Sequence, residues 1–117
     1  MRHKVEGRKL GRVKRQRVSL MRNLTTSLIL HERIVTTTAK AKSLKPKMER
    51  LITIAKKGDL NSKQRLMKDL FNNQIVVRKL MKVLAPKYME RTGGYLRVVR
   101  QGTRVGDAAP TSVIEFV

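Results

Sequence analysis

Residues 38–58 read TAKAKSLKPKMERLITIAKKG, and this stretch decides how the rest of the chain folds. Its apolar side chains recur every three or four positions, which places them on one face of an α-helix. Thr37 or Thr38 can cap the start of this helix, and Gly58 supplies its stop. The pattern therefore predicts a long amphipathic helix. Its buried face consists of Ala41, Leu44, Met48, Leu51, Ile52 and Ala55.

The segment before this stretch predicts one helix and one strand. Helical spacing begins at about residue 14, and this first helix should end near Leu30. Residues 34–37, Ile-Val-Thr-Thr, are β-branched throughout, which favours a short strand at 33–37. The apolar stripe of the first helix consists of Leu20, Met21, Leu24 and Leu28.

The segment after this stretch predicts two more helices. The first of them begins after Asp59 or Asn61, since either side chain can cap it. Pro86 can open one last turn that runs through Glu90. The earlier of the two helices buries Leu66, Met67, Leu70 and Phe71. The later one is marked by Val76, Val77, Leu80, Met81 and Leu84.

The hydrophobic period then changes from that of helices to that of strands. Residues 95–100 and 112–117 are strand-like, Gly93-Gly94 separates them from the helices, and 102–110 form the loop between them. Two strands alone are marginally stable, so the strand near 33–37 is their natural third partner. The sequence thus predicts a two-layer α+β fold of helix, strand, three helices and two strands. Its small three-stranded sheet is covered by helices.

Composition limits the function of this chain of 117 residues. It has 28 Lys and Arg against 8 Asp and Glu, a net charge of +20, and no cysteine. The lack of cysteine excludes disulfides, thiolate metal sites and cysteine nucleophiles. The apolar runs are far shorter than the roughly 20 residues that span a bilayer, and residues 1–4 lack the apolar core of a secretory signal. A protein this basic is expected to bind a polyanion.

The first 17 residues carry a large share of the charge. They contain eight Lys or Arg against Glu6 alone, together with two glycines and few apolar residues. Such a segment cannot pack a core, so it is interpreted as a basic arm that orders on a phosphate surface, followed by a single domain at 18–117. A solvated tail and a nuclear-import signal at 13–17 are the alternative interpretations.

The search for catalytic chemistry finds little. His31-Glu32 is similar to the start of a zinc-protease helix motif, but Val35 stands where the second histidine is needed. Acidic residues do not pair at a spacing suited to acid–base work, and the sequence predicts neither a cofactor, a metal nor an enzyme. The four aromatic residues are too scattered for a base-reading RNA module. Recognition should therefore use phosphates, sugar hydroxyls and shape.

A series of short motifs runs through the chain in order. They are Met1-Arg2-His3, Gly7-Arg8, Leu10, Arg12, Arg22-Asn23-Leu24, Ile34-Val35-Thr36-Thr37, residues 39–44, residues 51–56, residues 93–97 and residues 104–110. This series resembles the bacterial large-subunit ribosomal protein seventeen family over essentially the whole chain. Leu96 is a departure, because relatives often carry a polar residue there.

The resemblance implies a structural protein of the large ribosomal subunit that binds ribosomal RNA. Members of the family lie on the solvent side near the exit of the peptide tunnel, beside the small ribosomal protein thirty-two. The expected location is thus the ribosome in the cytoplasm, with an organellar ribosome left open. The implied fold agrees with the one that the residue pattern predicts.

The expected RNA-binding residues have distinct roles. The Lys and Arg residues of the arm would neutralise phosphates, His3 could stack or donate a hydrogen bond, and Arg22 would anchor the first helix. The hydroxyls of Thr36 and Thr37 would bind phosphate or cap the second helix. The full set is Arg2, His3, Lys4, Arg8, Lys9, Arg12, Lys14, Arg15, Arg17, Arg22, Thr36, Thr37, Lys40, Lys42, Gly93, Gly94, Tyr95, Arg97, Arg100 and Arg104.

Two groups in this set lie near the C-terminal end of the sequence. Gly93 and Gly94 allow positive φ or a close backbone approach, so they serve either RNA contact or a simple turn. The second group is Arg97, Arg100 and Arg104 on the strand pair, which form a second candidate RNA surface.

The alternative function is that of an architectural protein that compacts DNA. Such a protein is expected to dimerise and to insert an apolar wedge or a β-arm into the minor groove. The loop at 102–110 is short and lacks a convincing wedge, which favours RNA.

Overall fold

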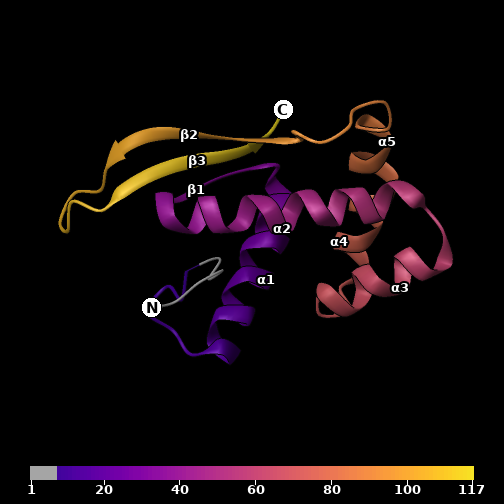
Figure 1. The fold of residues 1–117 in the computed structure, drawn as a ribbon, viewed down its shortest axis with the longest axis horizontal. Helices are drawn as coiled ribbons and strands as arrows, with labels where there is room; N and C mark the ends of the chain where they lie inside the picture. Colours follow the sequence, from indigo (N-terminus) through magenta and orange to yellow (C-terminus); the bar gives the residue numbers. More distant parts are fainter. Residues whose placement is uncertain (1–7) are drawn as a thin grey trace, which may run out of the picture.

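The computed structural model describes residues 8–117 and has the predicted α+β architecture (Figure 1). Its order of helix, strand, helices and two strands confirms the fold class. The elements are α1 (Lys14–His31), β1 (Arg33–Thr37), α2 (Thr38–Lys57), α3 (Leu60–Asp69), α4 (Gln74–Lys79), the π-helical turn η1 (Leu80–Leu84), α5 (Ala85–Lys87), β2 (Leu96–Thr103) and β3 (Pro110–Phe116).

The three strands form one antiparallel sheet in the order β1-β3-β2. The sheet lies along α2, and the β2–β3 hairpin extends past the start of that helix (Figure 1). Ile34 and Val98 both pair with Ile114, so these three side chains share the side of the sheet that packs on the core. The strands reach Thr103 and begin again at Pro110, which leaves a shorter loop than the sequence predicts.

Helix α2 is the centre of the core, as its pattern predicts. All six residues of the expected apolar face are buried, and Ile54 joins them. Gly58 ends the helix at φ 69°, a left-handed conformation that glycine adopts without a Cβ clash. The helix continues unbroken through Pro46.

Helix α1 has nearly the predicted bounds, and its buried face includes Met21 and Leu28 of the predicted stripe but is rotated toward Thr25 and Ile29. Its fully or nearly buried residues are Met21, Thr25, Leu28 and Ile29. Leu20 and Leu24 are only partly buried. Thr25 can face the core because its hydroxyl donates to the Met21 carbonyl at 2.7 Å, which satisfies the one polar group on that face.

The prediction that Phe71 is buried at the end of the third helix is wrong. Helix α3 ends at Asp69, and Phe71 and Asn72 both adopt φ 56°. This left-handed turn rotates Phe71 away from the face that carries Leu66 and Leu70, so its side chain remains 49% exposed. Helical periodicity does not extend past the point where the helix ends.

The remaining aromatic residues close the core where α5 meets the sheet. The Tyr88 ring centroid lies 5.4 Å from that of Tyr95 and 6.2 Å from that of Phe116. The Tyr88 hydroxyl donates to the Val117 carbonyl at 2.7 Å, which ties the end of β3 to the helical layer. The turn predicted to run through Glu90 is helical only as far as Lys87.

Candidate nucleic-acid interface

The first turn of α1 concentrates positive charge where a helix repels it. Lys14, Arg15 and Arg17 lie in or near this turn, which contains no acidic residue and follows Val13, a position that offers no side-chain cap. The positive end of the helix dipole disfavours cations there by about 0.3–1 kcal/mol each. A bound anion would reverse this cost, since it would be attracted both by the dipole and by the side chains.

Residues 8–13 fold back on themselves before entering α1. Leu10 and Gly11 take φ values of 54° and 64°, and the Arg12 amide donates to the Lys9 carbonyl at 3.1 Å. Arg12 Nη1 donates to the Leu10 carbonyl at 2.6 Å, and Arg17 Nη1 donates to the Arg12 carbonyl at 3.2 Å. The guanidinium groups of Arg12 and Arg17 are therefore held in place by backbone carbonyls.

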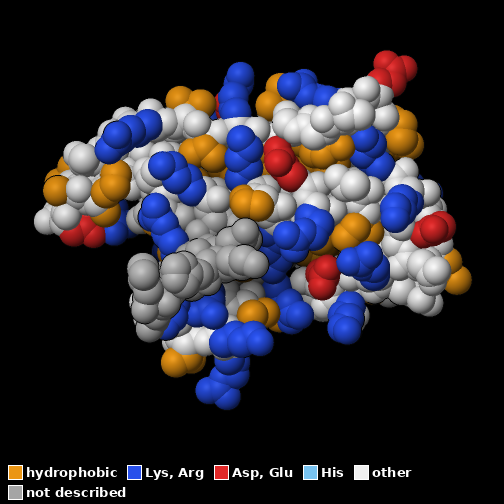
Figure 2. Space-filling model, viewed as in Figure 1, with side chains coloured by type: hydrophobic (Ala, Val, Ile, Leu, Met, Phe, Trp, Pro, Cys, Tyr) orange, Lys and Arg blue, Asp and Glu red, His pale blue; other side chains and the backbone are white. Residues whose placement is uncertain are grey.

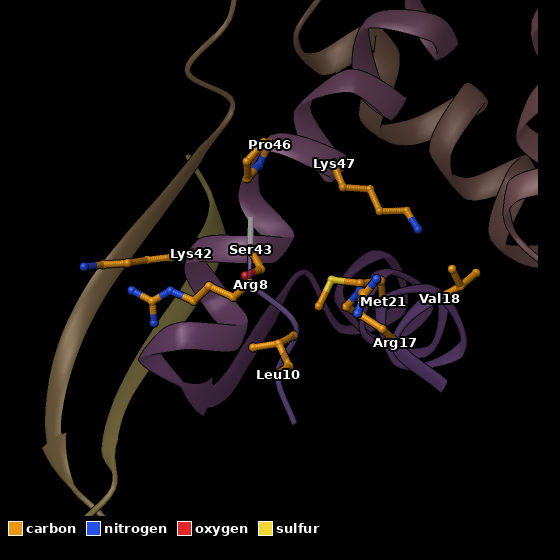
Figure 3. A pocket seen from close by; sticks show the side chains of 9 residues that line it. All are labelled: Arg8, Leu10, Arg17, Val18, Met21, Lys42, Ser43, Pro46 and Lys47. Atoms are coloured by element: carbon orange, nitrogen blue, oxygen red, sulfur yellow. The ribbon is translucent and has the colours of Figure 1, made fainter. Parts of the chain in front are cut away.

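A surface hollow lies between α1 and α2, and residues 8–10 close one side of it (Figure 3). We call this feature the α1–α2 hollow. Its volume is about 510 Å³, and four of its side chains are cations while none is acidic. The lining residues are Arg8, Leu10, Arg17, Val18, Met21, Lys42, Ser43, Pro46 and Lys47. An apolar floor with cations around it suits a phosphate backbone better than a neutral ligand.

A second hollow adjoins the first along α2, and we call it the α2–α3 hollow. It is lined by Ser43, Pro46, Lys47, Arg50, Leu51, Ile54, Arg65 and Asp69, the first three of which also line the α1–α2 hollow. Figure 2 shows that Lys and Arg side chains far outnumber Asp and Glu on the face seen there. The two adjoining hollows together are lined by six Lys and Arg side chains and one acidic side chain.

Lys47 lies between the two hollows in surroundings that oppose its charge. Burial lowers the pKa of its ammonium group; the carboxylate of Asp69 counteracts this shift, and Arg22 and Arg50 add to it. An anion that approaches a half-buried lysine among arginines stabilises the charged form of that lysine. The sequence pattern placed Lys47 off the apolar face but gave no sign that it would meet Arg8 and Arg17.

Several predicted site residues lie at the start of α2. Thr37 occupies the N-cap position, but among the described residues its side chain makes no bond to the first turn, so the predicted cap is wrong. The Thr38 hydroxyl instead pairs with Ser112 at 2.8 Å. Thr36, Thr37 and Lys40 are all partly exposed. Their polar groups remain open to a ligand.

The hairpin arginines do not form one surface. Arg97 donates to Glu115 at 2.7 Å, and Arg33 lies 3.5 Å from the same carboxylate. Arg100 pairs in register with Ser112, so it lies on the side of the sheet that faces α2. Arg104 is at the hairpin tip, where its Nε donates to Asp107 at 3.1 Å. Only Arg100 is directed toward the start of α2.

The Gly93-Gly94-Tyr95 segment lies at the other end of α2. The glycines adopt φ 83° and 63°, as the turn interpretation requires, and the Tyr95 side chain is only 2% exposed. Lys56 Nζ donates to the Tyr95 hydroxyl at 3.0 Å, which lowers the pKa of that phenol, and to the Arg91 carbonyl at 2.7 Å. The rise of the helix puts Lys56 about 21 Å from Lys42 along the axis, so this segment is separate from the α1–α2 hollow.

The predicted site residues Arg2, His3 and Lys4 lie outside the described residues. Of the others, the structure brings together Arg8, Arg17 and Lys42. Arg22 lies farther along α1, over the ring of Phe71. Lys47 joins them in the α1–α2 hollow, and Arg50 lies with Lys47 in the α2–α3 hollow. The sequence signal that could have paired these two is their spacing of three residues, which puts them on one side of α2.

Residues 8–117 lack two further classes of site. In this part of the chain, no helix combines the length and apolar character needed to cross a membrane. The same residues hold no group of three His, Cys, Asp or Glu side chains that could bind a metal ion. The fold and the two hollows define a small basic α+β domain with an anion-attracting surface.

Comparison with known proteins identifies the family. The model for Ribosomal protein L17 matches residues 20–117. The large ribosomal subunit protein bL17 of Orientia tsutsugamushi (strain Boryong) is 51% identical over 117 residues, covering all of this chain and 80% of that protein. The bL17 proteins of Wolbachia pipientis and Trichlorobacter lovleyi are 49% and 48% identical, again over the whole chain and over 83% and 94% of their own lengths.

This chain therefore belongs to the ribosomal protein L17 family. The resemblance carried by the sequence motifs is confirmed, and relatives are named as ribosomal proteins and not as enzymes.

Proposed function

We propose that this chain is a structural constituent of the large ribosomal subunit that binds ribosomal RNA and catalyses no reaction. The observation that carries the proposal is the α1–α2 hollow, where Arg8, Arg17, Lys42 and Lys47 meet without an acidic neighbour in its lining. Family membership supports it, because the relatives are named as large-subunit proteins. Phosphate contacts at the hollow would fix the position of the domain on folded RNA.

The finer parts of the proposal follow from the family resemblance. The protein would lie in the cytoplasm as part of the ribosome, on the solvent side near the exit of the peptide tunnel and beside protein thirty-two. Residues 1–17 would act as the RNA-binding arm, and residues 18–117 as the single folded domain. Since α1 begins at Lys14, the last arm cations would be presented by a rigid helix.

The test compares two pairs of charge-removing substitutions in the full chain. Arg17→Gln with Lys42→Gln removes charge from the α1–α2 hollow, whereas Lys63→Gln with Lys82→Gln removes the same charge from a hollow on α3 and η1. Each lost phosphate contact should flatten the slope of log affinity against log salt by about 0.7–0.9. We expect the first pair to reduce the slope for protein-free large-subunit RNA by about 1.4–1.8, and the second pair to leave it unchanged.

The same salt titration, carried out with duplex DNA, distinguishes RNA binding from the DNA-binding alternative. One structural observation favours that alternative, namely that Val105 is 100% exposed at the hairpin tip, where a wedge would be needed. Binding of duplex DNA as tight as that of the ribosomal RNA at equal salt would reject our proposal. Equal slope losses from both variant pairs would show that the hollow has no special role.

A further inference from the structure

Phe71 is the exposed aromatic residue of the described chain. The other three rings, those of Tyr88, Tyr95 and Phe116, are all buried in the core, whereas Phe71 is 49% exposed. It lies at the turn between α3 and α4, and its backbone is left-handed at φ 56°. Bulky residues seldom adopt this conformation. The turn therefore holds a large apolar ring at the surface, with about half of it open to solvent.

A cation covers part of this ring. The guanidinium carbon of Arg22 on α1 lies 4.7 Å from the ring centroid of Phe71. The rest of the ring surface remains open, as its exposure indicates. Phenyl and guanidinium groups are both planar, and both are surfaces on which unpaired bases stack in RNA-binding proteins. Stacking tolerates every base, because it uses the face of the base and not its edges.

Further positive charge lies near Arg22. Arg22 lies close enough to Lys47 to affect its ionisation, and Lys47 lines the α2–α3 hollow with Arg50 and Arg65. Asp69, two residues before Phe71, is the acidic residue in that lining. Positive charge near an exposed aromatic ring is the usual combination in sites for single-stranded nucleic acid.

We propose that Phe71 and Arg22 bind one unpaired base of the ribosomal RNA by stacking, with its phosphate held at Lys47 and Arg50. This inference rests on the proposed function, since it assumes that the chain binds ribosomal RNA and adds that the α3–α4 turn recognises an unpaired base of it. It adds to phosphate binding at the α1–α2 hollow a contact that depends on the base being unpaired. The stacked base would fix the position of the α3–α4 turn on the RNA.

The experiment measures the affinity of the full chain for protein-free large-subunit ribosomal RNA. Phe71→Leu keeps an apolar side chain on the same strained backbone but removes the ring, and Phe71→Tyr keeps the ring. We expect Phe71→Leu to weaken binding by about 5- to 100-fold, as loss of one stacked base predicts, and Phe71→Tyr to stay within about twofold. The matched control is Ile75→Ala, another exposed apolar residue, which should leave affinity unchanged.

The dependence of affinity on salt distinguishes a stacking contact from a phosphate contact. Phe71→Leu should leave the salt slope unchanged because no counterion is released by a stacked base, whereas Arg50→Gln should flatten it by about 0.7–0.9. Affinity of Phe71→Leu equal to that of the unaltered protein would overturn this inference alone, and would mean that the ring serves only to pack on Arg22. Failure of the unaltered protein to bind the RNA would overturn the proposed function as well.

Discussion

At the scale of single residues, Asp107 shows how one side chain organises the hairpin tip. Its carboxylate accepts hydrogen bonds from Arg104 Nε at 3.1 Å and from the Ala109 amide at 3.2 Å. The bond from Arg104, reinforced by that from Ala109, lowers the pKa of Asp107 from 3.8 to about 2. The charged form therefore stabilises the folded tip above about pH 4, and this contribution is lost as the pH falls through about 2.

The first prediction concerns this carboxylate. Replacing Arg104 by Gln removes the main cause of the shift, so the pKa of Asp107 should rise from about 2 toward 3.8. An NMR titration of the Asp107 side-chain carboxyl carbon in both proteins measures it. Arg100→Gln, on β2 before the tip and outside this network, is the control. Equal titration curves for Arg104→Gln and the unaltered protein would contradict the conclusion that Arg104 lowers the pKa of Asp107.

The second prediction concerns the centre of the core. Leu51 on α2 is 2% exposed, so Leu51→Ala should reduce the free energy of unfolding by about 2–5 kcal/mol through lost burial and a cavity. Leu60→Ala makes the same chemical change at a residue that is 70% exposed, and should cost less than about 0.5 kcal/mol. Urea unfolding of the two variants makes the comparison. Similar losses would show that the α2 face does not carry the core.

At the scale of elements, helices α1 and α2 end in the same way with different residues. Gly58 follows α2 at φ 69°, and Glu32 follows α1 at φ 62°. In each case the amide of the left-handed residue donates to a carbonyl of the last turn, at 3.1 Å for Gly58 and 2.7 Å for Glu32. Glycine adopts this conformation freely, whereas glutamate is strained in it. The C-terminal end of α1, at Glu32, is therefore less stable than it would be with glycine there.

The third prediction uses this difference. Gly58→Ala should destabilise the protein by about 1 kcal/mol, and Glu32→Gly should stabilise it by up to about 1 kcal/mol. Glu32→Ala is the control, because it removes the carboxylate that lies 3.9 Å from Lys79 while keeping the strained backbone. Thermal melts of the three variants provide the measurement. If Glu32→Gly is no more stable than Glu32→Ala, the strain at this position is unimportant.

The elements also show what the sequence could predict. Periodicity gave α2, the sheet strands and the fold class, because each of these signals repeats over several residues within one element. It failed at Phe71, where the outcome depends on a left-handed turn, and it missed the burial of Thr25 on α1, whose hydroxyl bonds its own helix. A left-handed turn and a side chain that bonds its own backbone are set by individual residues, which a period does not encode.

At the scale of the whole molecule, the two ends of α2 have different surroundings. Its first half contributes to both cationic hollows, and its second half is tied by Lys56 to the Gly93-Gly94-Tyr95 segment. The sequence could identify the cations, but it could not group them, because Arg8, Arg17 and Lys42 come from three segments that only the fold brings together. A charge of +20 attracts a polyanion, and the two hollows along α2 place six of the cations next to one another.

The last prediction separates the first residues from the folded domain. Since α1 begins at Lys14, deletion of residues 2–12 leaves every helix whole and removes five cations, Arg2, Lys4, Arg8, Lys9 and Arg12. If most of them bind phosphate, the salt slope for ribosomal RNA should flatten by about 2–4 units. The melting temperature should change little, because the buried core residues all lie beyond residue 20 and some self-repulsion is removed.

A paired salt titration and thermal melt of the full-length and shortened proteins tests both parts of this prediction. Lys63→Gln with Lys82→Gln is again the control for loss of charge elsewhere. An unchanged slope after the deletion would move RNA binding to the helices alone, where Arg17, Lys42 and Lys47 would have to supply it. A large fall in melting temperature would instead make residues 8–12 part of the fold, through the packing of Leu10 in the lining of the α1–α2 hollow.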